Sequence, residues 1–211
     1  MSANGRLTIA VPRGALFKET LDLLDAIEID TSEVRSNDRK LLFRDVGIIT
    51  MRPSDVPTYV AAGAADIGVT GKDVLIEQAE REVYELLDLG YGKCTMVLAS
   101  VAGDDPMEEA RRRLGMMRIA TKYPKIAARH FAATGRQAEM VEVKGSVELA
   151  PLTGLVDGIV DLTATGTTLR ENGLVVREEI VVCTARLIAN PVAHKLKAAA
   201  IDELLERVRA A

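Results

Sequence analysis

The chain has 211 residues, of which 48% are hydrophobic and 27% charged, so it is long enough to bury a core and too apolar to be disordered. Its formal net charge is −4, aromatic residues make up 3%, and Trp is absent, which argues against nucleic-acid binding through a broad basic surface or base-stacking platforms. Two cysteines are too few for a disulfide framework. With only two histidines besides, a zinc site is improbable.

Neither a membrane span nor a secretion signal is expected from the sequence. No uninterrupted apolar stretch approaches the roughly 18 residues of a spanning helix. The first residues, 1–6, are polar and lack the apolar core of a signal peptide. We therefore expect a cytoplasmic protein that binds no nucleic acid and no membrane.

The first part of the chain alternates short β-branched runs with amphipathic stretches. Apolar residues at helical spacing predict a helix, and short apolar runs bounded by Gly or Pro predict a strand. Residues 42–51 hold two apolar runs split by Arg44 and Asp45, which fits either a hairpin or one bent strand. The other predicted elements are a strand over 7–11, a helix over 15–27, a helix over 53–62, a strand over 66–70, a helix from 71 and a strand over 83–87.

Two glycines within Leu89-Gly90-Tyr91-Gly92-Lys93 mark a domain boundary, after which the alternation resumes. Such alternation predicts an α/β fold with mainly parallel sheets. We predict two lobes, residues 1–90 with 182–211 and residues 91–181, because a long β-rich stretch over 175–188 can cross back. The second part contains predicted strands over 94–101, 118–121, 138–143 and 158–162, and predicted helices over 105–114, 123–133, 147–152 and 195–209.

The most informative segment is a predicted strand that ends in Asp161 and runs into a turn of small and hydroxylic residues before a helix begins near Leu169. Backbone N–H groups and hydroxyls in such a turn can bind phosphate, and a carboxylate at the strand's end can accept hydrogen bonds from sugar hydroxyls. The alternative is a Thr-rich turn that only caps the helix. Neither a P-loop nor a dinucleotide-binding glycine pattern is present. The turn comprises Thr163, Ala164, Thr165, Gly166, Thr167 and Thr168.

The residues around this turn resemble the signature of the ATP phosphoribosyltransferase family. The matching run is Glu148, then Gly154-x-Val156-x-Gly158-Ile159-x-Asp161-Leu162-x-x-Thr165-Gly166-x-Thr168-Leu169. Further segments that look like this family cover most of the chain: 11–14, 38–41, 52–57, 63–75, 88–94 and 120–124. One departure is Arg13-Gly14-Ala15, which stands where many members resemble Lys-Gly-Arg.

The resemblance implies a fold, a size class and partners. The family fold is two α/β lobes, similar to type II periplasmic binding proteins. The chain resembles the short form, which lacks an additional C-terminal regulatory domain and depends on a separate regulatory subunit similar to histidyl-tRNA synthetase. A homodimer within a larger hetero-oligomer is implied.

The resemblance also implies a reaction in which N1 of the adenine of ATP attacks C1 of phosphoribosyl pyrophosphate and releases pyrophosphate, the first step of histidine biosynthesis. Mg²⁺ would arrive on the pyrophosphate, and no protein metal site is expected. The turn over 163–168 would hold the 5-phosphate and Asp161 the ribose hydroxyls. The remaining candidates are Arg13 and Gly14 for pyrophosphate, Arg39 and Arg52 for charge neutralisation, and Glu148 within the signature.

Blander interpretations compete with these assignments. Each arginine could form only a surface ion pair, and Arg52 has Asp55 three residues on as a ready partner. The whole chain could be a two-lobed small-molecule binding module or a different phosphoribosyltransferase. Purine and orotate enzymes resemble each other in having two adjacent acidic residues before the phosphate turn, whereas here Leu162 follows Asp161.

Overall fold

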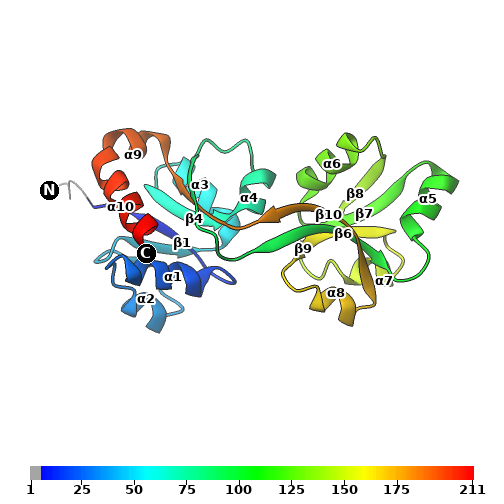
Figure 1. The fold of residues 1–211 in the computed structure, drawn as a ribbon, viewed down its shortest axis with the longest axis horizontal. Coiled ribbons are helices and arrows are strands. Elements are labelled where there is room, and N and C mark those ends of the chain that lie inside the picture. Colours follow the sequence, from blue (N-terminus) through cyan, green and yellow to red (C-terminus); the bar gives the residue numbers. More distant parts are fainter. Residues whose placement is uncertain (1–5) are drawn as a thin grey trace. The chain divides into compact units, whose positions relative to one another are not determined.

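The computed structural model describes residues 6–211, which form two compact units (Figure 1). One unit comprises residues 6–92 and 184–211, and the other comprises residues 93–183. The polar stretch 1–5, for which no signal peptide is expected, lies outside the described residues. None of the helices in the described part is long and apolar enough to cross a membrane.

The first unit is built on a six-stranded sheet in the order β2-β3-β1-β4-β11-β5. The central strands β1, β3 and β4 pair in parallel, whereas β2, β11 and β5 pair antiparallel with their neighbours. The strands are β1 (Ile9–Pro12), β2 (Leu42–Phe43), β3 (Ile48–Met51), β4 (Ile67–Gly71), β5 (Tyr84–Asp88) and β11 (Ala185–Ala189).

Helices cover both faces of this sheet, because successive residues of a strand point to opposite sides. Val11 of β1 belongs to a core cluster that contains side chains of α1 and α10, whereas Ala10 belongs to a second cluster with residues of α3. Gly68 of β4 allows α3 to pack closely, since a Cβ there would lie 2.7 Å from a methyl of Val56. The helices are α1 (Phe17–Ala26), α2 (Ser32–Ser36), the 3₁₀ turn η1 (Pro53–Asp55), α3 (Val56–Ala61), α4 (Lys72–Glu77), α9 (Pro191–Leu196) and α10 (Ala198–Ala210).

The second unit is built on a five-stranded sheet in the order β10-β6-β9-β7-β8. The pairs β7–β8 and β7–β9 are parallel, and β6 pairs antiparallel with both β9 and β10. One face carries a core cluster that includes Val97, Ile159 and Leu169. The elements are β6 (Cys94–Val101), α5 (Pro106–Leu114), β7 (Met117–Thr121), α6 (Pro124–Ala133), β8 (Ala138–Glu142), α7 (Leu149–Leu152), β9 (Gly158–Thr163), α8 (Thr167–Glu171) and β10 (Leu174–Cys183).

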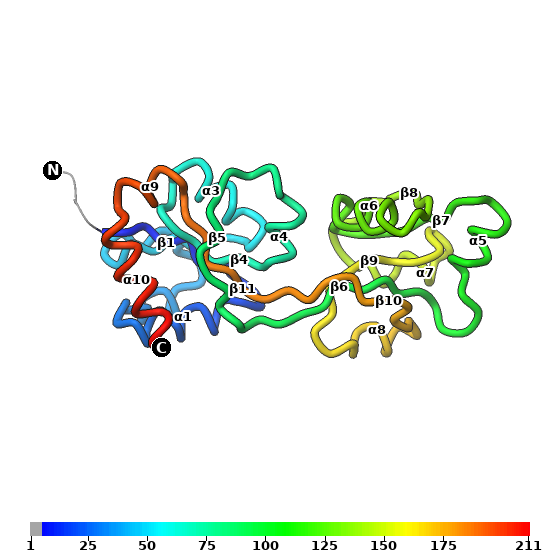
Figure 2. The backbone as a smooth tube through the Cα atoms, turned by 45° about the horizontal axis from the view of Figure 1, so that its top comes forward, coloured from blue at the N-terminus to red at the C-terminus, as the bar shows by residue number. Residues whose placement is uncertain are grey.

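The two-lobed α/β class is confirmed, but the sheets are mixed rather than mainly parallel. Figure 2 shows the reason: the chain leaves the first unit along β6 and returns along β10 and β11. Strands that lead away and strands that lead back run in opposite directions, so β10 pairs antiparallel with β6 and β11 antiparallel with β5. Residues 42–51 form a hairpin of β2 and β3, which settles that alternative.

Candidate active site

The loop between β9 and α8 lines a cavity of about 170 Å³ within the second unit. It follows the carboxyl end of β9, a position where α/β sheets place ligands. Every predicted member of the turn except Gly166 lines this cavity, together with the predicted Asp161 and Glu148. The lining residues are Val97, Glu148, Asp161, Leu162, Thr163, Ala164, Thr165, Thr167, Thr168 and Leu169.

Local hydrogen bonds fix the shape of this loop. Gly166 adopts a left-handed φ of +71°, and its N–H donates to Oγ1 of Thr163 at 2.8 Å. The hydroxyls of Thr165 and Thr167 lie 2.9 Å apart. Side chains of Ala164, Thr165, Thr167 and Thr168 are nevertheless exposed, so the cavity is an open one.

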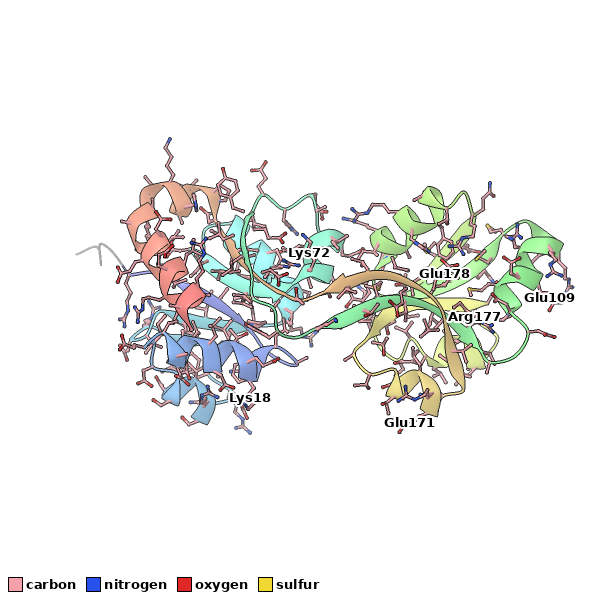
Figure 3. All side chains as sticks on the ribbon, viewed as in Figure 1. Lys18, Lys72, Glu109, Glu171, Arg177 and Glu178 are labelled. Carbon is pink, nitrogen blue, oxygen red and sulfur yellow. The ribbon has the colours of Figure 1, made fainter. Side chains whose placement is uncertain are left out.

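Arg170 adds a positive charge to the loop, which the sequence did not predict. Its guanidinium donates to the carbonyl oxygen of Thr165 at 2.9 Å and to Oγ1 of Thr167 at 3.0 Å. The helix α8 has only five residues and ends at Glu171 (Figure 3), so its dipole is small. Any affinity for an anion therefore comes mainly from the N–H groups and hydroxyls of the turn and from Arg170.

Asp161 is a buried carboxylate, with 7% of the residue exposed. Burial raises its pKa above the ordinary value of 3.8, and the charge of Glu148 raises it further. The Leu162 N–H, which donates to Oδ1 at 2.9 Å, and the charge of Lys122 act in the opposite direction. Such a carboxylate is costly for the fold, which is typical of functional groups.

Lys122 is a second residue of the site that the sequence did not predict. Its Nζ lies 3.9 Å from Oδ2 of Asp161. The proximity arises because β7 and β9 are parallel neighbours with Thr121 opposite Val160, so the residues that follow them lie at one sheet edge. The signal in the sequence is the position of Lys122 directly after a predicted strand, but the pairing of the two strands was needed to interpret it.

Glu148 occupies the position before α7 and is partly buried. It lines the same cavity as Asp161, and its charge affects the pKa of that carboxyl. The structure thus brings together two carboxylates, a lysine and the Thr-rich turn, although they come from separate segments of the second unit.

The other four predicted residues, Arg13, Gly14, Arg39 and Arg52, belong to the first unit. Arg13 and Arg52 lie side by side at one sheet edge. They follow the paired residues Pro12 and Met51, and the Arg13 N–H donates to the Met51 carbonyl at 2.7 Å. Gly14 has a φ of +87° with open space where a Cβ would be, so a ligand could approach its backbone closely.

The guanidinium of Arg13 contacts its own unit on several sides. It donates to Oγ1 of Thr50 and to the carbonyl of Lys40, both at 3.0 Å. It also lies 5.2 Å from the ring centroid of Phe17 and 3.6 Å from a carboxylate oxygen of Asp38. These contacts hold the segment that carries Arg39.

Arg39 and Arg52 present exposed side chains. Within residues 6–211, neither guanidinium forms an ion pair; the Asp55 carboxylate, the possible partner of Arg52, accepts a hydrogen bond from the Ser54 hydroxyl at 3.4 Å. The first unit thus carries two exposed cationic side chains that have no ion-pair partner among the residues that the structure describes.

Comparison with known proteins identifies the family. The family described as ATP phosphoribosyltransferase matches residues 52–210. The ATP phosphoribosyltransferase of Rubrobacter xylanophilus is 52% identical over 205 residues, which cover 96% of this chain and 94% of the relative. That of Bacillus licheniformis is 44% identical over 206 residues, covering 96% and 93%.

A solved structure agrees with this result. The chain is similar, with a TM-score of 0.82 and 34% identity over 97% of both chains, to a chain of the ATP phosphoribosyl transferase (HisG:HisZ) complex from Thermotoga maritima. Part of the signature that carries the sequence resemblance lines the cavity of the second unit: Glu148, Asp161, Leu162, Thr165, Thr168 and Leu169. The chain belongs to the ATP phosphoribosyltransferase family.

Proposed function

We propose that this chain condenses ATP with phosphoribosyl pyrophosphate to give N1-(5-phosphoribosyl)-ATP and pyrophosphate, the first step of histidine biosynthesis. Adenine N1 forms a bond to C1 of the ribose while the bond from C1 to the pyrophosphate oxygen breaks. Family membership supports this reaction. The observation within the fold that carries it is the cavity that joins Asp161 to the Thr-rich turn, since a sugar phosphate needs both a carboxylate for its hydroxyls and donors for its phosphate.

The second unit is proposed to bind the phosphoribosyl group. Residues 163–168 bind the 5-phosphate through N–H groups and hydroxyls. The guanidinium of Arg170, which donates hydrogen bonds to this turn, adds positive charge. Asp161 accepts hydrogen bonds from the ribose hydroxyls. Lys122 keeps the carboxylate of Asp161 oriented toward the cavity. Glu148 stabilises the positive charge that develops on the sugar as pyrophosphate leaves.

The first unit is proposed to offset the charge of the two polyanionic substrates. Arg39 and Arg52 have exposed guanidinium groups that can bind phosphate oxygens, and the open backbone at Gly14 can approach pyrophosphate. Arg13 contributes mainly by holding the Arg39 segment, because its own guanidinium is already bonded to Thr50 and Lys40. Most of the rate then comes from positioning and electrostatics.

Mg²⁺ is proposed to enter as part of the substrate, bound to pyrophosphate oxygens. Within residues 6–211 no group of three His, Cys, Asp or Glu side chains could hold a metal ion. The carboxylates of Asp161 and Glu148 line one cavity and offer hard oxygen ligands, which suits a metal that arrives with most of its coordination filled. The ion supplies positive charge to the leaving group.

A regulatory subunit is the proposed partner. The Thermotoga maritima relative is a HisG:HisZ complex, and the chain covers 97% of the matching chain. We propose that this protein forms a homodimer within a hetero-oligomer with a subunit similar to histidyl-tRNA synthetase, in the cytoplasm. Sedimentation of the chain with and without that subunit tests the assembly, and an unchanged mass on mixing would refute it.

The decisive experiment measures pyrophosphate release with phosphoribosyl pyrophosphate and one second substrate at a time. Release with ATP, and not with orotate or hypoxanthine, is expected. Release with either of the latter alone would indicate a different phosphoribosyltransferase. Tight binding of ATP and phosphoribosyl pyrophosphate without turnover, in the presence of the regulatory subunit, would indicate a binding module.

A further inference from the structure

The only two cysteines of the chain lie opposite each other in the second unit. Cys94 begins β6 and Cys183 ends β10, and the antiparallel register pairs them directly. Directly opposite residues share one face of the sheet and have Cβ atoms about 4.5–5.5 Å apart. Two residues far apart in the sequence are thus brought to a spacing at which their side chains can meet.

This spacing is close to that of a disulfide. Bonded cysteines have Cβ atoms about 3.5–4.5 Å apart, so a shift of about 1 Å closes the bond. Both cysteines stand at strand ends, where the ladder stops and such a shift disturbs few hydrogen bonds. In the structure both are thiols.

The two thiols differ in access to solvent. Cys183 is 1% exposed, whereas Cys94 is partly exposed. An oxidant in solution therefore reaches Cys94 first, and Cys183 lies within the sheet as the group that can attack the oxidised sulfur. A solvent-accessible thiol next to a second cysteine is an arrangement found in redox-sensing proteins.

We propose that Cys94 and Cys183 form a reversible redox pair that closes into a disulfide on oxidation by peroxide. The sulfur of Cys94 attacks one peroxide oxygen, the O–O bond breaks, and a sulfenic acid and water result. The sulfur of Cys183 then attacks that sulfenic sulfur and displaces a second water. Two thiols and one peroxide give one disulfide and two waters, and a dithiol reductant reverses the bond by exchange.

The disulfide would link the two ends of the second unit covalently. That unit runs from Lys93 to Cys183, so the pair joins its first strand to its last. A bond across so long a loop restricts the unfolded chain strongly and stabilises the folded one. Cys94 and the cavity-lining Val97 are separated by an odd number of positions on β6, so the bond forms on the face away from the cavity. The proposal therefore does not depend on the enzymatic assignment.

The test uses the reduced full-length protein treated with hydrogen peroxide. After this treatment, neither thiol should react with a thiol reagent when the chain is denatured. The mass of the intact chain should fall by two hydrogen atoms. Digestion should yield a Cys94–Cys183 cross-linked peptide from a monomeric band on a non-reducing gel. Calorimetry should show a rise in unfolding temperature of several degrees, and dithiothreitol should reverse every change.

Cys94→Ser is the matched control, because it alters the partly exposed cysteine and leaves the buried one in place. It should fold like the wild type and show no disulfide and no peroxide-induced shift in unfolding temperature. Two thiols that stay reactive in oxidised wild-type protein would overturn the proposal. Sulfinic acid at Cys94, or cross-links only between chains, would overturn it as well.

Discussion

Replacing Asp161 with Asn tests the proposed ribose contact most directly. An ionised carboxylate contributes about 1.5–3 kcal/mol per hydrogen bond that it accepts from a hydroxyl. Asn keeps one oxygen acceptor but loses the charge and the second acceptor. About 2–4 kcal/mol of transition-state stabilisation is then lost, which corresponds to a fall of about 30- to 1000-fold in kcat/KM.

The same change should not weaken the fold. Burial raises the pKa of Asp161 above its ordinary value of 3.8, so the folded chain binds this proton more tightly than the unfolded chain. The free energy of unfolding therefore falls as the pH rises through the raised pKa, and the ionised group is a cost at neutral pH. Asn removes that ionisation, so the melting temperature of the variant at pH 7 should equal or exceed that of the wild type. The advantage should shrink as the pH is lowered toward 3.8.

The assay is pyrophosphate release with ATP and phosphoribosyl pyrophosphate, run beside a thermal melt. Asp157→Asn is the matched control, because Asp157 precedes the opposite end of β9 and accepts a hydrogen bond from the Arg118 N–H at 2.7 Å. That control should retain normal kcat/KM. Near-normal activity of Asp161→Asn, or an equal loss in Asp157→Asn, would refute the assigned role.

Three further expectations follow from the site. Thr165→Val removes one exposed hydroxyl donor, which should cost about 1 kcal/mol of binding free energy and raise the Kd for phosphoribosyl pyrophosphate about fivefold in calorimetric titration. The control Thr134→Val should leave this Kd unchanged. An unaltered Kd for the Thr165 variant would exclude that contact. Arg13→Ala should lower the free energy of unfolding in urea by about 2–3 kcal/mol through the lost contacts with Thr50, Lys40 and Phe17. Arg52→Ala should change it by less than about 0.5 kcal/mol, and equal stabilities would contradict the bracing role of Arg13. Chelation of Mg²⁺ should abolish turnover and re-addition should restore it, whereas full turnover in excess chelator would disprove the metal proposal.

The sequence alone determined what depends on local order along the chain. Alternating strands and helices predicted the α/β class, and the strand, turn and helix around Asp161 form one continuous segment whose residue types are readable in sequence. The family resemblance rested on the same segment, and Glu148 was included because it lies in that signature.

Only the tertiary structure decided what depends on strand pairing. Lys122 approaches Asp161 because β7 and β9 are parallel neighbours, and Cys94 faces Cys183 because β6 and β10 run in opposite directions. Strand order and direction are set by long-range packing, since the same apolar run can pair with a neighbour in either direction. Local patterns therefore predicted the helices, the strands and the Thr-rich turn. The mixed sheets, the approach of Lys122 to Asp161 and the cysteine pair could be identified only from the folded chain.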